Sequence, residues 1–136
     1  MTEPARLEPP VTEEAEPFWD ATRRQELALP WCRHCQRPFW YPRPVCPTCL
    51  SPDVEWRPSS GRGQVYAVSV MHRPSNPSMA ERVPYAVALI DLDDGVRMMS
   101  NVVGVEAERV EVGMDVTLTW EPLSDGRHLP LFAPVV

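Results

Sequence analysis

Four cysteines are the residues of this 136-residue chain whose type and spacing most clearly support chemistry, and all four fall within 18 residues. Cys32 pairs with Cys35 and Cys46 with Cys49, with two residues between the members of each pair. Two thiolates on one tight turn, folded against a second such turn, form the tetrahedral four-sulfur site that zinc prefers. We therefore predict one structural zinc ion. Iron is the alternative, because a tetrathiolate site accepts either metal.

Two disulfides or a thioredoxin-like redox pair are the other interpretations of these cysteines. Disulfides suit a small secreted protein, but no apolar signal segment precedes the cysteines. A redox pair needs one Cys-x-x-Cys at the start of a helix, whereas two copies flank several prolines here. No stretch approaches the ~20 apolar residues of a membrane span. Reduced cysteines and no targeting segment lead us to expect a cytoplasmic protein without membrane contact.

Groups for catalysis are scarce outside the cysteines. His34, His72 and His128 fit no triad order, and the sequence has neither a Gly-x-Ser-x-Gly motif nor a phosphate-binding loop. A metal held by four cysteines also has no open position for water or substrate. We therefore expect a protein that is not itself an enzyme.

The cysteine segment is also a basic region in an acidic protein. The chain has a net charge of -6, yet Arg33, Arg37 and Arg43, here called the arginine patch, lie among residues 27–52 without any acid. These arginines either compensate the charge of about -2 on a four-thiolate zinc site or bind a small anion such as a nucleotide-like phosphate. A pI near 5.0 argues against a nucleic-acid partner.

Three segments precede and surround the cysteines. Residues 1–16 are rich in proline and acid and predict a mobile tail. Residues 17–25 predict a short helix with too few apolar residues to be stable alone, so it must pack on its own chain or on a partner. Strands are predicted at 27–31, 37–41 and 54–56, and together with the helix they make residues 17–58 a zinc-ribbon unit.

The remaining residues, 59–136, predict an all-β domain. Alternating and β-branched stretches predict five strands at 64–72, 83–92, 96–103, 115–121 and 129–133, with a helical turn at 106–109. Five short strands with a helical insertion between the third and fourth are the outline of an OB-fold barrel. A sandwich fragment is the alternative, because periodicity does not reveal strand order.

The order of these motifs resembles a known family. The segments that carry the resemblance are 18–19, 27–35, 39–43, 45–49, 60–66, 72–74, 83–85 and 99–104. They are similar to the domain of unknown function thirty-five family, in which a helix, a rubredoxin-like zinc ribbon and an OB-fold share one chain. One departure is that Gln36 and Arg37 follow Cys35 where many ribbons have a glycine. We expect a non-glycine residue to take the left-handed conformation there, at modest cost.

The resemblance implies an accessory subunit for an acyl-CoA enzyme, with the catalytic residues in the partner. The expected partner is a thiolase-superfamily enzyme, either a thiolase or a retro-aldol lyase of steroid side-chain or related acyl-CoA degradation, in a two-plus-two heterotetramer. A subunit of an acyl-CoA hydratase or dehydrogenase, and a single-stranded nucleic-acid-binding OB protein, are the alternatives. Candidate contacts with coenzyme A or the partner are the arginine patch and four aromatic residues: Arg33, Arg37, Arg43, Trp31, Trp40, Phe18 and Trp19.

Overall fold

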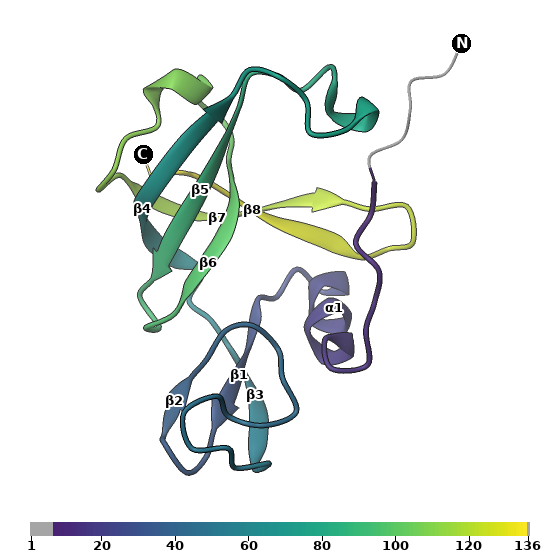
Figure 1. The fold of residues 1–136 in the computed structure, drawn as a ribbon, viewed down its shortest axis with the longest axis vertical. Helices are drawn as coiled ribbons and strands as arrows, with labels where there is room; N and C mark the ends of the chain where they lie inside the picture. The colour runs from purple at the N-terminus through teal and green to yellow at the C-terminus, as the bar shows by residue number, and fades with distance from the viewer. Residues whose placement is uncertain (1–6, 136) are drawn as a thin grey trace.

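The computed structural model describes residues 7–135, which form a small ribbon, one helix and a β-barrel (Figure 1). The ribbon has the strand order β2-β1-β3, and the closed barrel has the order β4-β5-β6-β8-β7. The helix and the ribbon strands are α1 (Glu16–Arg23), β1 (Ala28–Cys32), β2 (Arg37–Pro38) and β3 (Val54–Pro58). The barrel elements are β4 (Arg62–Met71), η1 (Pro77–Met79), β5 (Tyr85–Leu92), β6 (Arg97–Val102), η2 (Ala107–Arg109), β7 (Asp115–Pro122) and β8 (His128–Pro134).

The closed barrel distinguishes the predicted OB-fold from the alternative of a sandwich fragment. The first strand, β4, pairs antiparallel with β5 along most of its length and with β7 near its start. A short parallel pairing of β6 with β8, at Val102 and Phe132, closes the other side. The five-stranded order with η2 between β6 and β7 is that of an OB-fold, so the prediction of a barrel is confirmed.

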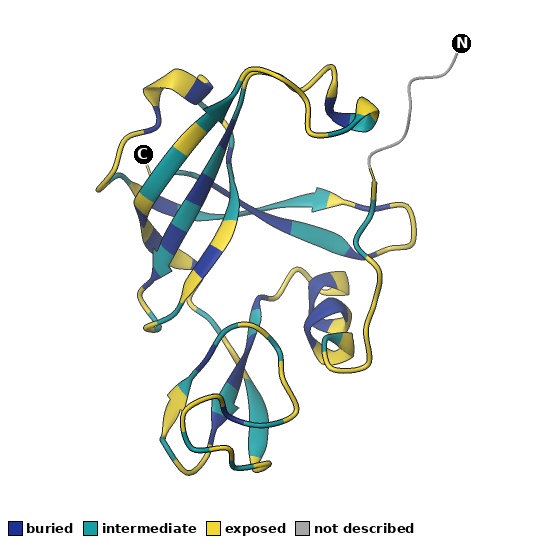
Figure 2. Ribbon diagram, in the orientation of Figure 1, coloured by how far each residue is buried: buried dark blue, intermediate teal, exposed yellow. Residues whose placement is uncertain are grey.

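The barrel interior is formed by alternate residues of its strands. On β5 every second residue is buried, from Ala86 to Leu92, as the period of 2 in a strand requires (Figure 2). Ile90, Val116 and Phe132 are inaccessible to solvent. Full burial of such side chains stabilises the fold by about 2 to 3 kcal/mol each. These residues belong to a different apolar cluster from the four cysteines.

Helix α1 packs within its own chain. Phe18 and Trp19 are only 5% and 8% exposed, and both belong to the same core cluster as the barrel residues. Figure 1 shows α1 beneath the β7–β8 hairpin and above the ribbon. The helix was predicted to pack either on its own chain or on a partner, and its aromatic residues pack on its own chain. The two aromatic residues predicted as partner contacts are covered intramolecularly, because the helix needs them for its own packing.

The helix ends earlier than the predicted residue 25. Gln25 has φ of 57°, and the N–H of Glu26 donates to the carbonyl of Ala21 at 3.1 Å. Such a left-handed residue followed by a long backward hydrogen bond is the Schellman ending of a helix. The strand predicted at 37–41 is also too long. Its ladder stops at Pro38, and after the N–H of Phe39 bonds to Pro30 the chain turns away.

The predicted tail, 1–16, is partly visible. Residues 1–6 lie outside the described part of the chain. Leu7 donates its N–H to Ser78 at 3.2 Å, and the carboxylate of Glu8 accepts hydrogen bonds from the N–H and hydroxyl of Ser124. The mobility of this segment and the boundaries at 16/17 and 58/59 stay predictions. Within residues 7–135, no helix has the length and apolar character to span a membrane.

Candidate functional site

The four cysteine sulfurs lie together at the end of the ribbon. All Sγ atoms are within 4.8 Å of one another, with Cys32 to Cys49 at 3.5 Å and Cys35 to Cys46 at 3.9 Å. Around a zinc ion with bonds of about 2.3 Å, tetrahedral geometry places the sulfurs about 3.8 Å apart. A disulfide would need about 2.05 Å between the sulfurs. The cluster therefore fits a single tetrahedral metal ion, and the disulfide interpretation is wrong.

Two matching turns present these sulfurs. In each turn the residue after the second cysteine donates its N–H to the carbonyl of the first, from Gln36 to Cys32 and from Leu50 to Cys46, both at 2.8 Å. Gln36 and Leu50 have φ of 57° and 63°. The expected left-handed residue after Cys35 is confirmed, and the second turn repeats it. A modest steric strain between the Cβ and the backbone is the cost of placing non-glycine residues there.

The protein groups around the sulfurs shift the pKa values of Cys46 and Cys35 in opposite directions. The N–H groups of Cys49 and Thr48 lower the pKa of the Cys46 thiol to about 6, so this sulfur is ionised at neutral pH. Hydrogen bonding to Cys49 and burial raise the pKa of Cys35 to about 12. Metal binding must displace the proton from Cys35, and it therefore releases protons to solvent.

Apolar side chains cover the sulfur cluster and leave it closed. Cys32 and Cys46 are buried, and Phe39 and Val54 pack against them. With four sulfurs and no further ligand in reach among residues 7–135, a bound ion has a complete coordination shell. The site can hold the ribbon together, and it offers no position at which a substrate could meet the metal.

Ion pairs distinguish Arg33 from the other two members of the arginine patch. Arg33 donates to Asp53 at 2.9 Å and to Glu55 at 3.1 Å. Hydrogen bonds from Arg57 and Arg33 lower the pKa of the Glu55 carboxyl, which keeps it charged. Much of the charge of Arg33 is therefore compensated by Asp53, just before β3, and by Glu55 within β3. The other two members of the patch, Arg37 and Arg43, lie on the surface of the ribbon.

The structure brings three of the four predicted aromatic contacts together. Phe18 lies edge-on to Trp19 at 4.9 Å and to Trp40 at 5.3 Å, measured between ring centroids. Trp31 is elsewhere, with the guanidinium of Arg57 4.1 Å from its ring centroid. The role of these residues and of the arginine patch in binding coenzyme A or a partner stays a prediction. The histidines lie in separate parts of the fold, His34 in the first cysteine turn, His72 just after β4 and His128 at the start of β8.

The sequence analysis missed a groove beside the aromatic cluster. It has a volume of about 430 Å³ and runs along β6 and β8, with Met98 and Met99 in its wall. These neighbouring methionines were the available signal. Met98 is buried, whereas Met99 points to the other face of β6 and is 57% exposed, so an apolar residue at a strand position that alternation leaves to solvent marked this surface.

A closed four-cysteine ribbon joined to an OB barrel defines a class of two-part β proteins. The family profiles that match this chain are "ChsH2, rubredoxin-like zinc ribbon domain" over residues 19–55 and "ChsH2, C-terminal OB-fold domain" over residues 56–121. A chain of the solved structure titled "Ltp2-ChsH2(DUF35) aldolase" is 33% identical, with a TM-score of 0.85 over 95% of this chain and 100% of that one. This chain belongs to the DUF35 family, as its sequence motifs indicated.

Two curated relatives are longer proteins. The "Probable enoyl-CoA hydratase alpha subunit" of Thermomonospora curvata is 36% identical over 98% of this chain and 42% of the relative. The "3-oxo-4,17-pregnadiene-20-carboxyl-CoA hydratase alpha subunit" of Mycobacterium tuberculosis is 31% identical over 89% of this chain and 38% of the relative. This chain thus spans about two fifths of the length of these two proteins. Both are named as the alpha subunit of a hydratase.

Proposed function

We propose that this chain is a non-catalytic accessory subunit, stabilised by zinc, that binds a thiolase-superfamily enzyme acting on an acyl-CoA. The match to the Ltp2-ChsH2(DUF35) aldolase chain carries the proposal, because it extends over all of that chain at 33% identity. The closed sulfur cluster and the scattered histidines agree with it, since they leave catalysis to the partner. Zinc is preferred over iron because the matching ribbon profile is that of a zinc ribbon.

Co-expression tests the choice of partner. A tagged version of this chain is produced with the thiolase-like enzyme encoded nearest to its gene, and the purified material is passed through a sizing column with light scattering. We expect one species with the mass of two copies of each chain. Two separately eluting proteins would contradict the proposal. Metal analysis of the same material, produced without added zinc, should find one zinc ion per copy of this chain.

The second candidate function is a subunit of an acyl-CoA hydratase. The names of the two hydratase alpha subunits favour it, although each is more than twice the length of this chain. The same experiment with a hydratase of the hot-dog fold as the partner separates the two candidates. A stable complex with the hydratase and none with the thiolase-like enzyme would establish the second function in place of the first.

The arginine patch can be tested in the assembled complex. We expect that Arg37→Ala combined with Arg43→Ala lowers the affinity for the acyl-CoA, because the surface loses two positive charges that a phosphate can use. Arg33 is left intact because its ion pairs support the ribbon. Arg62→Ala combined with Arg109→Ala removes two exposed arginines from the barrel and is the matched control. Equal affinities of the two variants, measured by calorimetry, would refute this use of the patch.

A further inference from the structure

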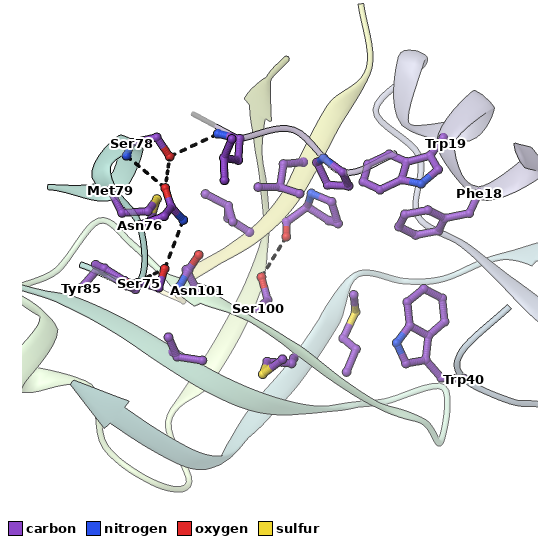
Figure 3. A pocket seen from close by; sticks show the side chains of 18 residues that line it. Phe18, Trp19, Trp40, Ser75, Asn76, Ser78, Met79, Tyr85, Ser100 and Asn101 are labelled. Carbon is purple, nitrogen blue, oxygen red and sulfur yellow. Dashed lines mark hydrogen bonds between the residues drawn. The ribbon is translucent and has the colours of Figure 1, made fainter. Parts of the chain in front are cut away.

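The groove beside the aromatic cluster is a concave surface formed by several elements of the fold. Segments that are far apart in sequence line it: residues before α1, the helix itself, the ribbon residue Trp40, the β4–β5 connection with η1, and the strands β5, β6 and β8. In Figure 3 the aromatic residues Phe18, Trp19 and Trp40 stand at one end and the polar residues around Asn76 at the other. Its volume of about 430 Å³ falls within the range of small-molecule sites, which is ~300 to 1,000 Å³.

The wall of the groove is uncharged. Among the described residues that line it there is no arginine, histidine, aspartate or glutamate, although about a quarter of the chain is charged. Methionine, leucine, valine and proline side chains contribute to the lining, including Met99 and Leu129. An ionised group placed here would lose its hydration without gaining a partner, which is costly. The groove therefore selects for an uncharged molecule.

The polar groups at the far end of the groove already have partners. Asn76 accepts from the N–H of Ser78 at 3.0 Å, and Asn101 donates to the carbonyl of Ala86 at 2.9 Å. The hydroxyl of Ser100 donates to the carbonyl of Pro130 at 2.8 Å. These hydrogen bonds lie within the chain, so none of the three groups requires a ligand as its partner. Their role in the groove is to form part of its wall.

Trp40 differs from these residues. Its indole Nε1 is shielded from solvent and has no hydrogen-bond partner among the described residues. Figure 3 shows the nitrogen edge of the ring turned toward the other lining side chains. A buried donor without an acceptor costs ~1 to 3 kcal/mol. Nε1 of Trp31 is in the same state, but of these two indoles only Trp40 lines the groove. The methionines in the wall are flexible enough to admit an acceptor to this position.

We propose that the groove is a binding site for an uncharged, elongated, apolar molecule whose carbonyl, hydroxyl or ether oxygen accepts a hydrogen bond from Nε1 of Trp40. The apolar body of the ligand lies along Met98, Met99 and Leu129. The proposal goes beyond the accessory role and does not depend on the identity of the partner, because this chain alone supplies the whole lining.

The test uses the metal-loaded full chain and the neutral fluorescent ketone 6-propionyl-2-(dimethylamino)naphthalene. Its emission moves to shorter wavelength in an apolar site, so a titration gives the dissociation constant. We expect saturable binding at one site. Trp40→Phe keeps a ring against Phe18 and removes the donor, and it should weaken binding about five- to tenfold. The anionic probe 1-anilinonaphthalene-8-sulfonate should not compete.

A charge in the wall provides a second variant. Met99 is 57% exposed, so Met99→Arg should fold and should abolish binding by placing a cation in the apolar wall. Val112, 67% exposed and outside the groove, gives the matched control Val112→Arg, which should bind as the unchanged chain does. Circular dichroism and metal content confirm folding of each variant. Absence of saturable binding, equal binding by Met99→Arg, or full affinity in Trp40→Phe would each overturn the proposal.

Discussion

Two almost fully buried polar side chains, Thr22 and Arg127, join the helix to the barrel. The hydroxyl of Thr22 accepts from the N–H of His128 at 3.2 Å, and the ring Nδ1 of His128 donates to the carbonyl of Thr22 at 2.8 Å. Arg127 donates to the carbonyl of Pro9 at 2.9 Å, and its guanidinium lies 4.8 Å from the ring centroid of Trp19. These bonds keep polar atoms satisfied at the junction, so the junction can stay dry.

Thr22→Val tests this junction. The variant keeps the shape of the side chain but removes the acceptor for the N–H of His128, so the free energy of unfolding should fall by ~1 to 3 kcal/mol. Thr22→Ser keeps the hydroxyl and is the control. It should lose less stability, since only one buried methyl group is removed. Urea denaturation followed by tryptophan fluorescence measures both. If serine and valine were equally destabilising, the hydrogen bond would not be the cause.

The ion pair between Asp91 and Arg97 predicts a dependence on pH. The hydrogen bond from Arg97 lowers the pKa of the Asp91 carboxyl below its usual range. A lowered pKa in the folded state stabilises the protein at pH values above the unfolded pKa, and the contribution disappears as the pH falls through the folded pKa. The unchanged chain should therefore be slightly more stable than Asp91→Asn at neutral pH, and the difference should shrink as the pH falls below the ordinary aspartate range and vanish once the carboxyl is protonated in both the folded and the unfolded state.

Urea denaturation of both proteins at a series of pH values gives this difference. Asp93→Asn makes the same change in the exposed turn beside the ion pair and serves as the control. A difference between the chain and Asp91→Asn that stayed constant down to the most acidic conditions would show that the carboxylate charge is not responsible.

At the scale of elements, β4 approaches the backbone of β5 closely at Gly63. Gly63 lies where β4 pairs with both β5 and β7, opposite Leu92 and Val116. A Cβ at this position would lie 2.5 Å from the carbonyl oxygen of Asp91, which is part of the β5 backbone and cannot easily move. Glycine is needed here for close approach of two strands, since the backbone conformation itself is ordinary.

Gly63→Ala should therefore weaken the closure of the barrel. Forcing strands apart costs ~1 to 3 kcal/mol or more, and this should appear as a loss in the free energy of unfolding measured with urea. Gly95→Ala is the control, because nothing lies within 4 Å of a Cβ there and only its φ of +103° is unfavourable. A smaller effect at position 63 than at 95 would mean that β4 and β5 separate easily.

The sequence predicted most elements because their patterns are local. The alternation of buried residues along β5, the hairpin turn at Gly95 and the cysteine spacing each depend on neighbours in the chain. What could not be predicted depends on distant contacts. The packing of Phe18 on Trp40 and the pairing of Arg33 with Glu55 join segments whose approach only the folded chain decides. The groove was missed for the same reason.

At the scale of the whole molecule, residues 7–135 form two apolar cores. The larger contains the barrel interior, the aromatic residues of α1, and Leu27 and Leu29 at the start of the ribbon. The smaller consists of the cysteines with Phe39 and Val54. The smaller core is too small to be stable without its ion, whose binding supplies on the order of 10 kcal/mol or more in such sites.

Removal of the metal should therefore affect the two parts differently. After chelation, amide hydrogens of residues 32–54 should exchange rapidly, while those of the strands β4 to β8 should keep most of their protection. Hydrogen exchange read by mass spectrometry, before and after chelation, gives the result by segment. Acid should mimic the chelator, because protonation of the thiolates competes with the metal. Loss of protection throughout the barrel would mean that the two cores unfold together.

The place where the ribbon leaves the rest of the fold has a further consequence. The N–H of Ser59 bonds to the carbonyl of Leu27 at 2.7 Å, and Ala28 lies directly opposite Pro58. Residues 28–58 thus begin and end at neighbouring points. The distance between these two points is one that a two-residue hairpin turn can span. The chain enters and leaves the ribbon at one spot, so the order of strands in the barrel does not depend on the length of the ribbon. The ribbon is still part of the same folded unit, because Leu29 belongs to the larger core and Trp40 packs against it.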